Sequence, residues 1–454
     1  MQRDTIVALA TPAGVSAIAV IRMSGPLSRQ LFRHFVPNIE FSPKTLYHCK
    51  YLSREEKVLD DVLMVFFPAA SSYTGEDAVE IYCHGNMLIV EKILADLCAR
   101  GCKFAEPGEF TKLAFLNGKL DLCQAEAVAD VIHATNERAI QVAQNQLSGS
   151  LSSKINAVSR DLLDVLARIE MEIDFSDDEI FDEKTFLREI LHRIGAAAKE
   201  LNALIESNKY HSVINNGIST VILGEPNAGK SSLFNFLLGE DRAIVSEIAG
   251  TTRDIISERM IIGSNVLKIC DMAGLRDGTL GEIEKTGIVK AITRASNADF
   301  FLIVVNINSS TLPVIPNKIV NCLNDANALV VVNKIDLPKN CNVEDFLPHL
   351  DRIEISIKNE TNPQPLKTKI SEVISRNKTL NNDIDIVVNA RHVDILGRAN
   401  KYLEIVQSKL LQPLHIETIA SDIRQSLEIL GEITGTYDNE RMLDLIFSNF
   451  CIGK

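Results

Sequence analysis

Two short motifs, in a fixed order along the chain, restrict its possible folds more than any other feature. Gly224–Ser231 reads GEPNAGKS and fits G-x-x-x-x-G-K-[ST], a loop that wraps phosphate groups. Its backbone N–H groups close around phosphate oxygens, Lys230 reaches the β- and γ-phosphates, and the Ser231 hydroxyl suits Mg2+. Asn333–Asp336 reads NKID and fits NKxD, in which the Asp336 carboxylate accepts from guanine N1–H and the 2-amino group. Adenine lacks both donors, so such a site selects guanine.

The sequence around both motifs is typical of a doubly wound α/β domain with a mostly parallel sheet. The segment 218–223 is apolar and β-branched, as in a buried parallel strand, and 231–238 reads as a helix that begins at the lysine. This order aims a helix N-terminus at phosphate. Further buried strands are predicted at 266–270, 300–305, 328–332 and 352–355. The strand at 328–332 delivers NKID to its carboxyl end, where ligands bind in open α/β sheets.

Other stretches in the same region complete the predicted nucleotide site. Residues 271–274 read DMAG, a DxxG in which Asp271 holds Mg2+ through water and the Gly274 N–H contacts the γ-phosphate. Thr251 or Thr252 supplies the switch hydroxyl for Mg2+. Residues 356–358 (SIK) stand where an SAK-type loop packs against guanine.

Leu275 follows DxxG, where many GTPases carry a glutamine that orients the attacking water. An aliphatic side chain cannot do this, so we expect Glu282 or Glu284, in the polar segment that follows, to take the role. The long segment 243–254 (AIVSEIAGTTRD) can present backbone carbonyls around the phosphates. Carbonyls need a cation, and a monovalent ion there would replace an arginine finger electrostatically.

Composition is that of a multidomain globular protein. The 454 residues are 46% hydrophobic and 24% charged, which suits roughly two to four domains. The sequence predicts no membrane span and no signal peptide. Nine cysteines without a secretion signal point to free thiols and a cytoplasmic location. Because the net charge is −13, a nucleic-acid partner would need a local basic patch or a basic partner protein.

The patterning changes three times along the chain. Residues 1–118 mix strand-like runs (5–9, 17–21, 61–67) with a helix at 86–100, as in an α+β domain. Residues 119–216 show apolar positions at helical spacing: Leu162, Val165, Leu166, Ile169 and Ile173. The nucleotide-binding segment covers 217–378. Helical patterning returns at 379–454, with helices predicted at 393–411, 416–431 and 439–447. We therefore predict one helical domain, split in sequence by an inserted nucleotide-binding domain.

Several stretches together resemble one family over the whole chain. They are GEPNAGKSSLFN (224–235), IVSEIAGTTRD (244–254), DMAGLR (271–276), NKID (333–336), YTGEDAVEIYCHG (73–85), AEPGEFTKLAFLNGKLDLCQAEAVADVI (105–132) and FCIGK (450–454). With them the chain resembles the tRNA modification GTPase MnmE (TrmE) family. The resemblance implies a multidomain α/β protein: an N-terminal α+β folate-binding domain that dimerises, a split all-α helical domain and an inserted P-loop GTPase domain.

The resemblance also assigns roles to single residues of the nucleotide site. It implies K+ ligands at Asn227, Ser246, Ile248 and Thr251, Mg2+ ligands at Ser231 and Thr252, and catalytic roles for Lys230 and Glu284, with Glu282 as the alternative. The motifs and the resemblance together place these residues against GTP: Asn227, Ala228, Gly229, Lys230, Ser231, Ser232, Ser246, Glu247, Ile248, Ala249, Gly250, Thr251, Thr252, Asp271, Met272, Ala273, Gly274, Asn333, Lys334, Asp336, Ser356, Ile357 and Lys358. Met272 and Ile357 depart from the usual DTAG and SAK, at positions that donate no obligatory side chain.

A second implied site binds 5-formyltetrahydrofolate or a related folate through Arg22, Glu80, Lys119 and Lys454. A carboxylate can pair with the pterin-like N–H edge, and cations suit the glutamyl tail. Cys451 is either catalytic near the folate or a buried, inert thiol. We expect 450–454 to lie beside this N-terminal site and to contribute little to the core.

The implied activity is hydrolysis of GTP, dependent on K+, in tRNA wobble uridine modification. The implied partners are a second copy of the chain, a flavoprotein of the MnmG (GidA) family in a heterotetramer, and tRNA. Two alternatives stay open: a regulatory GTPase of ribosome assembly, and a stand-alone folate-dependent methyl- or aminomethyltransferase with a regulatory GTPase insert.

Overall fold

The computed structural model describes residues 4–37, 42–174, 183–238, 257–263, 265–270, 298–377, 385–411, 416–435, 443, 446–448, 450 and 453. They form two compact units. Unit 1 contains Met1–His133, Ala143–Asn202 and Asp394–Lys454, and unit 2 contains Ala134–Val142 and Ala203–Val393. The predicted domain boundaries at 118, 216 and 378 differ from this division and stay a prediction.

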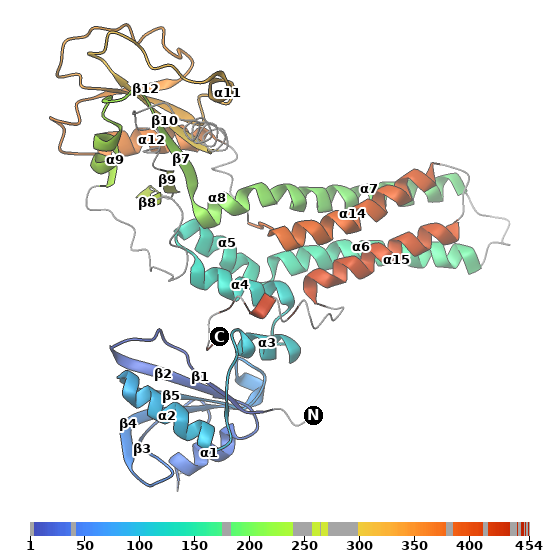
Figure 1. Ribbon diagram of the computed structural model, residues 1–454. Helices are drawn as coiled ribbons and strands as arrows, with labels where there is room; N and C mark the ends of the chain where they lie inside the picture. Colours follow the sequence, from blue (N-terminus) through green and yellow to red (C-terminus); the bar gives the residue numbers. More distant parts are fainter. Residues whose placement is uncertain are drawn as a thin grey trace, which may run out of the picture. The chain divides into compact units, whose positions relative to one another are not determined.

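Unit 1 begins with a six-stranded sheet in the order β3-β4-β5-β2-β1-β6 (Figure 1). The strands are β1 (Ile6–Leu9), β2 (Ser16–Ser24), β3 (Leu46–Leu52), β4 (Val58–Phe67), β5 (Ala78–Gly85) and β6 (Lys103–Phe104). All neighbours are antiparallel except β1 and β6. Three of these strands fall where the sequence predicts them, at 5–9, 17–21 and 61–67.

Helices cover both faces of this sheet. On one face, α1 (Ser28–Phe35) and α2 (Met87–Ala99) share a buried core with Val7, Ile21, Met64 and Ile81. On the other face, α3 (Glu109–Leu116) brings Phe110 against Ile6 and Ala8, because side chains alternate along β1. The short helix η1 (Ala69–Ser71) lies between β4 and β5. Helix α2 confirms the helix predicted at 86–100: the Asn86 side chain caps it by accepting from Leu88 N.

The rest of unit 1 is helical (Figure 1). The elements are α4 (Leu122–His133), α5 (Glu137–Leu147), α6 (Ser150–Asp174), α7 (Glu183–Ser207), α14 (Ala390–Leu410) and α15 (Ile416–Thr434), of which α5, α7 and α14 continue into unit 2. Side chains link α6 to α7 (Arg193 to Asp164, 3.2 Å) and α14 to α15 (Arg398 to Glu432, 2.8 Å). The stripe predicted on α6 is buried from Leu162 to Ile169. The helices predicted at 393–411 and 416–431 are confirmed as α14 and α15.

Unit 2 contains the second sheet, in the order β12-β11-β10-β7-β9-β8 (Figure 1). The strands are β7 (Ile218–Leu223), β8 (Ser257–Ile262), β9 (Asn265–Cys270), β10 (Phe300–Asn306), β11 (Ala328–Asn333) and β12 (Asp351–Ile355). All neighbours are parallel except β8 and β9. The predicted mostly parallel, doubly wound sheet is therefore confirmed.

The helices of unit 2 pack on both faces of the second sheet. Helices α9 (Lys230–Leu238) and α12 (Gln364–Arg376) share one core with β7, β10 and β11, and α11 (Asn317–Val320) packs on the opposite face of the sheet. The shorter elements η2 (Asn208–Tyr210) and α8 (His211–Asn216) precede β7. None of the helices among the described residues of either unit could cross a membrane.

Candidate functional site

The loop between β7 and α9 has a backbone that only special residues adopt. Gly224, Asn227 and Gly229 have φ angles of 150°, 61° and 99°. A Cβ atom on Gly229 would lie 2.3 Å from Asn333 Nδ2, and one on Gly224 would lie 2.4 Å from the Val304 carbonyl oxygen. The motif glycines are therefore required both by backbone conformation and by close packing against the neighbouring strands.

Lys230 lies across this loop at the start of α9. Its Nζ donates to the carbonyl oxygens of Gly224, at 2.9 Å, and Glu225, at 2.8 Å. Ser231 and Ser232 are exposed in the first turn of α9, where backbone N–H groups have no partner within the helix. This arrangement of an ammonium group and a helix N-terminus is suited to bind phosphate.

The NKID motif packs directly on the phosphate loop. Asn333, buried at the end of β11, donates from Nδ2 to the Ala228 carbonyl oxygen at 3.0 Å. Lys334 adopts a φ of 66° and donates from Nζ to the Asn227 carbonyl oxygen at 2.7 Å. The first two residues of the motif therefore bind the loop and leave Asp336 to face a ligand.

Asp336 is fixed by the SIK segment that follows β12. Ser356 Oγ donates to Asp336 Oδ1 at 2.6 Å, and Ile357 N donates to Asn333 Oδ1 at 3.3 Å. The hydrogen bond from Ser356, with smaller contributions from the charges of Lys358 and Lys334, holds the pKa of Asp336 below its usual value. Asp336 is thus ionised at neutral pH, as an acceptor for two guanine donors must be.

Much of the predicted site lies outside the described residues. This applies to Ser246, Glu247, Ile248, Ala249, Gly250, Thr251, Thr252, Asp271, Met272, Ala273, Gly274, Glu282 and Glu284. Of the predicted metal ligands, the described residues include Asn227 for K+ and Ser231 for Mg2+. The exposed Ser231 hydroxyl beside Lys230 is a hard oxygen donor of the kind that Mg2+ prefers.

The N-terminal sheet brings two predicted folate residues together. Arg22 on β2 stands opposite Glu80 on β5. Its Nε and Nη2 donate to Glu80 Oε1 at 3.0 and 2.9 Å. Tyr82 donates to the other carboxylate oxygen, Oε2, at 2.9 Å. Arg22 Nη1 reaches the carbonyl oxygen of Gly453 at 3.3 Å, so the described part of the C-terminal tail lies beside this pair, as expected from the sequence.

Three aromatic residues beside this pair are absent from the predicted folate site. The Arg22 guanidinium lies 5.9 Å from the ring centres of both Tyr73 and Phe110. Burial raises the pKa of Tyr73 and, together with the bond to Glu80, that of Tyr82, so both phenols stay neutral. Tyr82 follows Glu80 by two positions on one strand, and this spacing could have placed it on the same face.

The remaining predictions for the folate site concern Lys119 and the C-terminal segment 450–454. Lys119 donates to the Ala70 carbonyl oxygen at 2.7 Å. Cys451 and Lys454 lie outside the described residues. The expectation that 450–454 adds little to the core is wrong for Phe450, which is 8% exposed and packs against Phe447 and Leu122. An aromatic side chain at this depth contributes to stability, so Phe450 belongs to the core.

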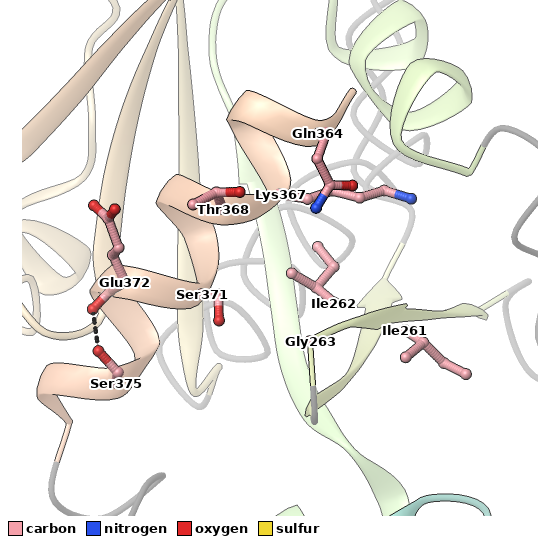
Figure 2. Close-up of a pocket in the computed structure, with 9 residues that line it drawn as sticks. All are labelled: Ile261, Ile262, Gly263, Gln364, Lys367, Thr368, Ser371, Glu372 and Ser375. Atoms are coloured by element: carbon pink, nitrogen blue, oxygen red, sulfur yellow. Dashed lines mark hydrogen bonds between the residues drawn. The ribbon is translucent and has the colours of Figure 1, made fainter. Parts of the chain in front are cut away.

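A cavity of about 490 Å³ lies at another part of the second sheet (Figure 2). Side chains of α12, among them Gln364, Lys367 and Ser371, line it together with Ile262 and Gly263 of the β8–β9 hairpin. Gly263 precedes β9, which runs parallel to β7, so it lies at the amino-terminal ends of these strands. The phosphate loop follows β7 at the opposite, carboxyl-terminal ends. The cavity therefore adds no residue to the nucleotide site.

Two family models match the chain. A model of the MnmE helical domain matches residues 122–451, and a model of the GTP-binding protein TrmE N-terminus matches residues 5–119. The chain belongs to the MnmE family. As a member of this family it is a GTPase that acts in tRNA modification.

Full-length relatives agree with this assignment. The tRNA modification GTPase MnmE of Natranaerobius thermophilus is 40% identical over 462 residues, which cover 100% of both chains. That of Opitutus terrae is 41% identical over 455 residues and 99% of both chains. That of Thermotoga maritima is 37% identical over 460 residues, 99% of this chain and 100% of the relative. The resemblance stated from the sequence is confirmed.

Proposed function

We propose that this MnmE family member uses K+ and Mg2+ to hydrolyse GTP to GDP and phosphate and, with an MnmG (GidA) family flavoprotein, modifies certain tRNAs. The modification adds a (carboxymethyl)aminomethyl group to carbon 5 of the wobble uridine, with a folate as the one-carbon source. The observation that carries the nucleotide part is the attachment of NKID to the phosphate loop. Hydrogen bonds from Asn333 and Lys334 to this loop fix the position of the base-reading carboxylate of Asp336 relative to Lys230.

In this proposal each residue of the nucleotide site acts on a different part of GTP. Asp336, oriented by Ser356, accepts from the base, while Lys230 and the first turn of α9 bind the phosphates. Ser231 and Thr252 hold Mg2+, which neutralises charge on the β- and γ-phosphates. Asn227, Ser246, Ile248 and Thr251 hold K+, which supplies positive charge where other GTPases use an arginine finger. Glu284, or Glu282, orients the attacking water.

The proposed folate site is built on the Arg22–Glu80 pair. The Glu80 carboxylate, held by Tyr82, accepts from the N–H edge of the pterin, and Lys119 and Lys454 pair with the glutamyl carboxylates. A charged pair joined by two hydrogen bonds at one carboxylate oxygen leaves the other oxygen to Tyr82 and to a ligand. This site favours a folate role over the ribosome-assembly alternative, in which the N-terminal domain would only dock partners.

The proposed assembly is a cytoplasmic homodimer that combines with the flavoprotein into a heterotetramer and binds tRNA. Ile18, Leu46 and Leu63 support the dimer: they are 59%, 56% and 40% exposed and lie on the sheet face opposite α1 and α2. The free cysteines among the described residues support a reducing compartment. GTP hydrolysis is coupled to domain rearrangement in this proposal.

Nucleoside analysis of tRNA from cells that lack the protein tests the proposal. The wobble uridine should lose its side chain, and the wild-type gene should restore it. The Arg22→Ala variant should not restore it. Arg29→Ala breaks a comparable ion pair, with Asp77 on the same domain, and this control variant should restore the modification. Intact modification without the protein would exclude the proposed reaction, and loss of ribosome subunits alone would favour the ribosome-assembly alternative.

A further inference from the structure

Glu225 lies at a variable position of the phosphate-loop motif and carries a negative charge into a loop that binds anions. Its carboxylate accepts hydrogen bonds from a segment outside this loop. Thr311 Oγ1 donates to Glu225 Oε1 at 3.2 Å, and Ser309 Oγ donates to Oε2 at 3.3 Å. Both hydroxyls belong to the segment that follows β10, so the carboxylate is turned toward that segment.

The same glutamate holds Lys230 through its backbone. The Lys230 ammonium group donates to the carbonyl oxygens of two consecutive residues, Gly224 and Glu225. The side chain of Glu225 is thus attached to the segment after β10, while its carbonyl oxygen fixes the lysine that reaches the phosphates. Attachment of the side chain at its far end limits the movement of the backbone that carries this carbonyl oxygen.

The segment after β10 is itself attached to the base-reading side. Asn308 Nδ2 donates to the Pro338 carbonyl oxygen at 2.9 Å, and Asn340 N donates to the Ile307 carbonyl oxygen at 2.9 Å. Pro338 and Asn340 follow Asp336 closely in sequence. Residues 307–311 therefore connect the phosphate loop with the segment that reads the base.

We propose that Glu225 is a positioning residue for the phosphate half of the nucleotide site. Hydrogen bonds from Ser309 and Thr311 fix its carboxylate and thereby the carbonyl oxygens that hold Lys230. The proposal rests on GDP and GTP as ligands of this site. The lysine binds phosphate and Asp336 binds the base, so loss of this attachment weakens binding of phosphorylated ligands and spares the nucleoside.

Titration of the full-length protein with GDP and with guanosine separates these effects. Glu225→Ala and the double variant Ser309→Ala/Thr311→Val should each raise the Kd for GDP about three- to tenfold, the effect of losing one or two hydrogen bonds. Both should leave the Kd for guanosine within about twofold of the wild-type value. Glu225→Gln keeps an acceptor oxygen and should retain most of the GDP affinity. Ser375→Ala, which removes a hydroxyl of α12 that bonds to Glu372, is the control.

Combining the variants adds a second criterion. If Glu225 acts through the two hydroxyls, Glu225→Ala/Ser309→Ala/Thr311→Val should bind GDP no more weakly than Glu225→Ala alone. An unchanged GDP affinity in Glu225→Ala would overturn the proposal while the wild-type GTPase activity still stood. So would an equal loss of GDP and guanosine affinity with a lower thermal midpoint, because that result describes general damage to unit 2.

Discussion

Asp336 is an exposed side chain with one orientation, because Ser356 holds one of its oxygens. The hydrogen bond from the serine also lowers the pKa of the Asp336 carboxyl, and it orients the base-reading group before a ligand arrives. Asn333 and Lys334 bind the phosphate loop at the carbonyl oxygens of Ala228 and Asn227 and so fix the position of Asp336 relative to that loop.

The Asp336→Asn variant should lose its preference for GTP and gain affinity for XTP. An amide offers one acceptor and one donor, which match the 2-oxo group of xanthine better than the 2-amino group of guanine. Binding titrations with both nucleotides measure this change. A retained preference for GTP would remove Asp336 from base reading.

The Glu284→Ala variant should have a much lower kcat and a nearly unchanged affinity for GTP. A residue that only orients water stabilises the transition state and not the bound substrate. Groups of this kind typically accelerate the chemical step roughly 10²–10⁴-fold. Single-turnover hydrolysis and nucleotide titration measure the two quantities. If Glu282→Ala shows this behaviour and Glu284→Ala does not, the water-orienting residue is Glu282.

Sequence predicts residues that belong to motifs and misses those that act through non-local contacts. Lys230 and Asp336 stand at positions where the motif requires their chemistry. Glu225 stands at a variable position, and its hydroxyl partners come from a segment far along the chain. Tyr73 was missed for the same reason, because it lies outside the strands and only the folded chain brings it to Arg22. Tyr82 could have been placed from its spacing to Glu80 on β5.

At the scale of elements, buried parallel strands are the most predictable parts. β7 matches its predicted bounds, and β10, β11 and β12 differ from them by one residue at one end. For β7, β10 and β11 the reason is that strands buried on both faces are nearly continuous apolar runs, whereas β12 is mostly half-buried. Strand β3 was not predicted: apart from the buried Tyr51 its residues alternate between exposed and half-buried, and polar side chains hide the pattern. The pairing order of either sheet depends on contacts between distant segments and could not be read from spacing.

Asp130 on α4 provides a prediction about stability. Burial, with a smaller contribution from Glu126, raises its pKa from 3.8 to about 6. Between these values the folded state binds more protons than the unfolded chain, so the free energy of unfolding falls as pH rises through this window. Asp130→Asn should remove a penalty on the order of 1–3 kcal/mol above about pH 7 and have little effect below about pH 4. Thermal unfolding at both pH values measures this; equal shifts at both would contradict it.

The C-terminal tail provides a prediction about the proposed folate site. Deletion of Cys451–Lys454 removes the carbonyl that Arg22 Nη1 contacts and spares the buried Phe450. Folate binding should weaken and tRNA modification should be lost, while GTP hydrolysis stays within about twofold of wild type, because the nucleotide site belongs to unit 2. Cys451→Ser in the full chain is the companion variant: normal modification in it would assign the thiol an inert role. A deleted protein that modifies tRNA normally would contradict the prediction.

At the scale of the whole molecule, hydrolysis is predicted to depend on which monovalent cation is present. We expect the long segment 243–254 and Asn227 to present oxygen ligands to a monovalent ion, and carbonyl cages select ions by size. Potassium, rubidium and ammonium should activate GTP hydrolysis and sodium should not. Turnover per molecule should also rise as the GTPase domains pair. Equal rates in sodium and potassium buffers would contradict the K+ site.

The division of unit 1 into separate stretches has a consequence for its synthesis. Helices α6 and α7 leave the ribosome before residues 208–389 have been made, and α15, which packs on α6, comes later still. At about 5–20 residues per second, this delay lasts roughly 10–40 s. During that time α15 is absent from the surface of α6, whose side chains Leu162, Val165 and Leu166 are buried in the folded protein. Until α15 has been made, α6 therefore exposes apolar surface of the kind that aggregates or binds chaperones.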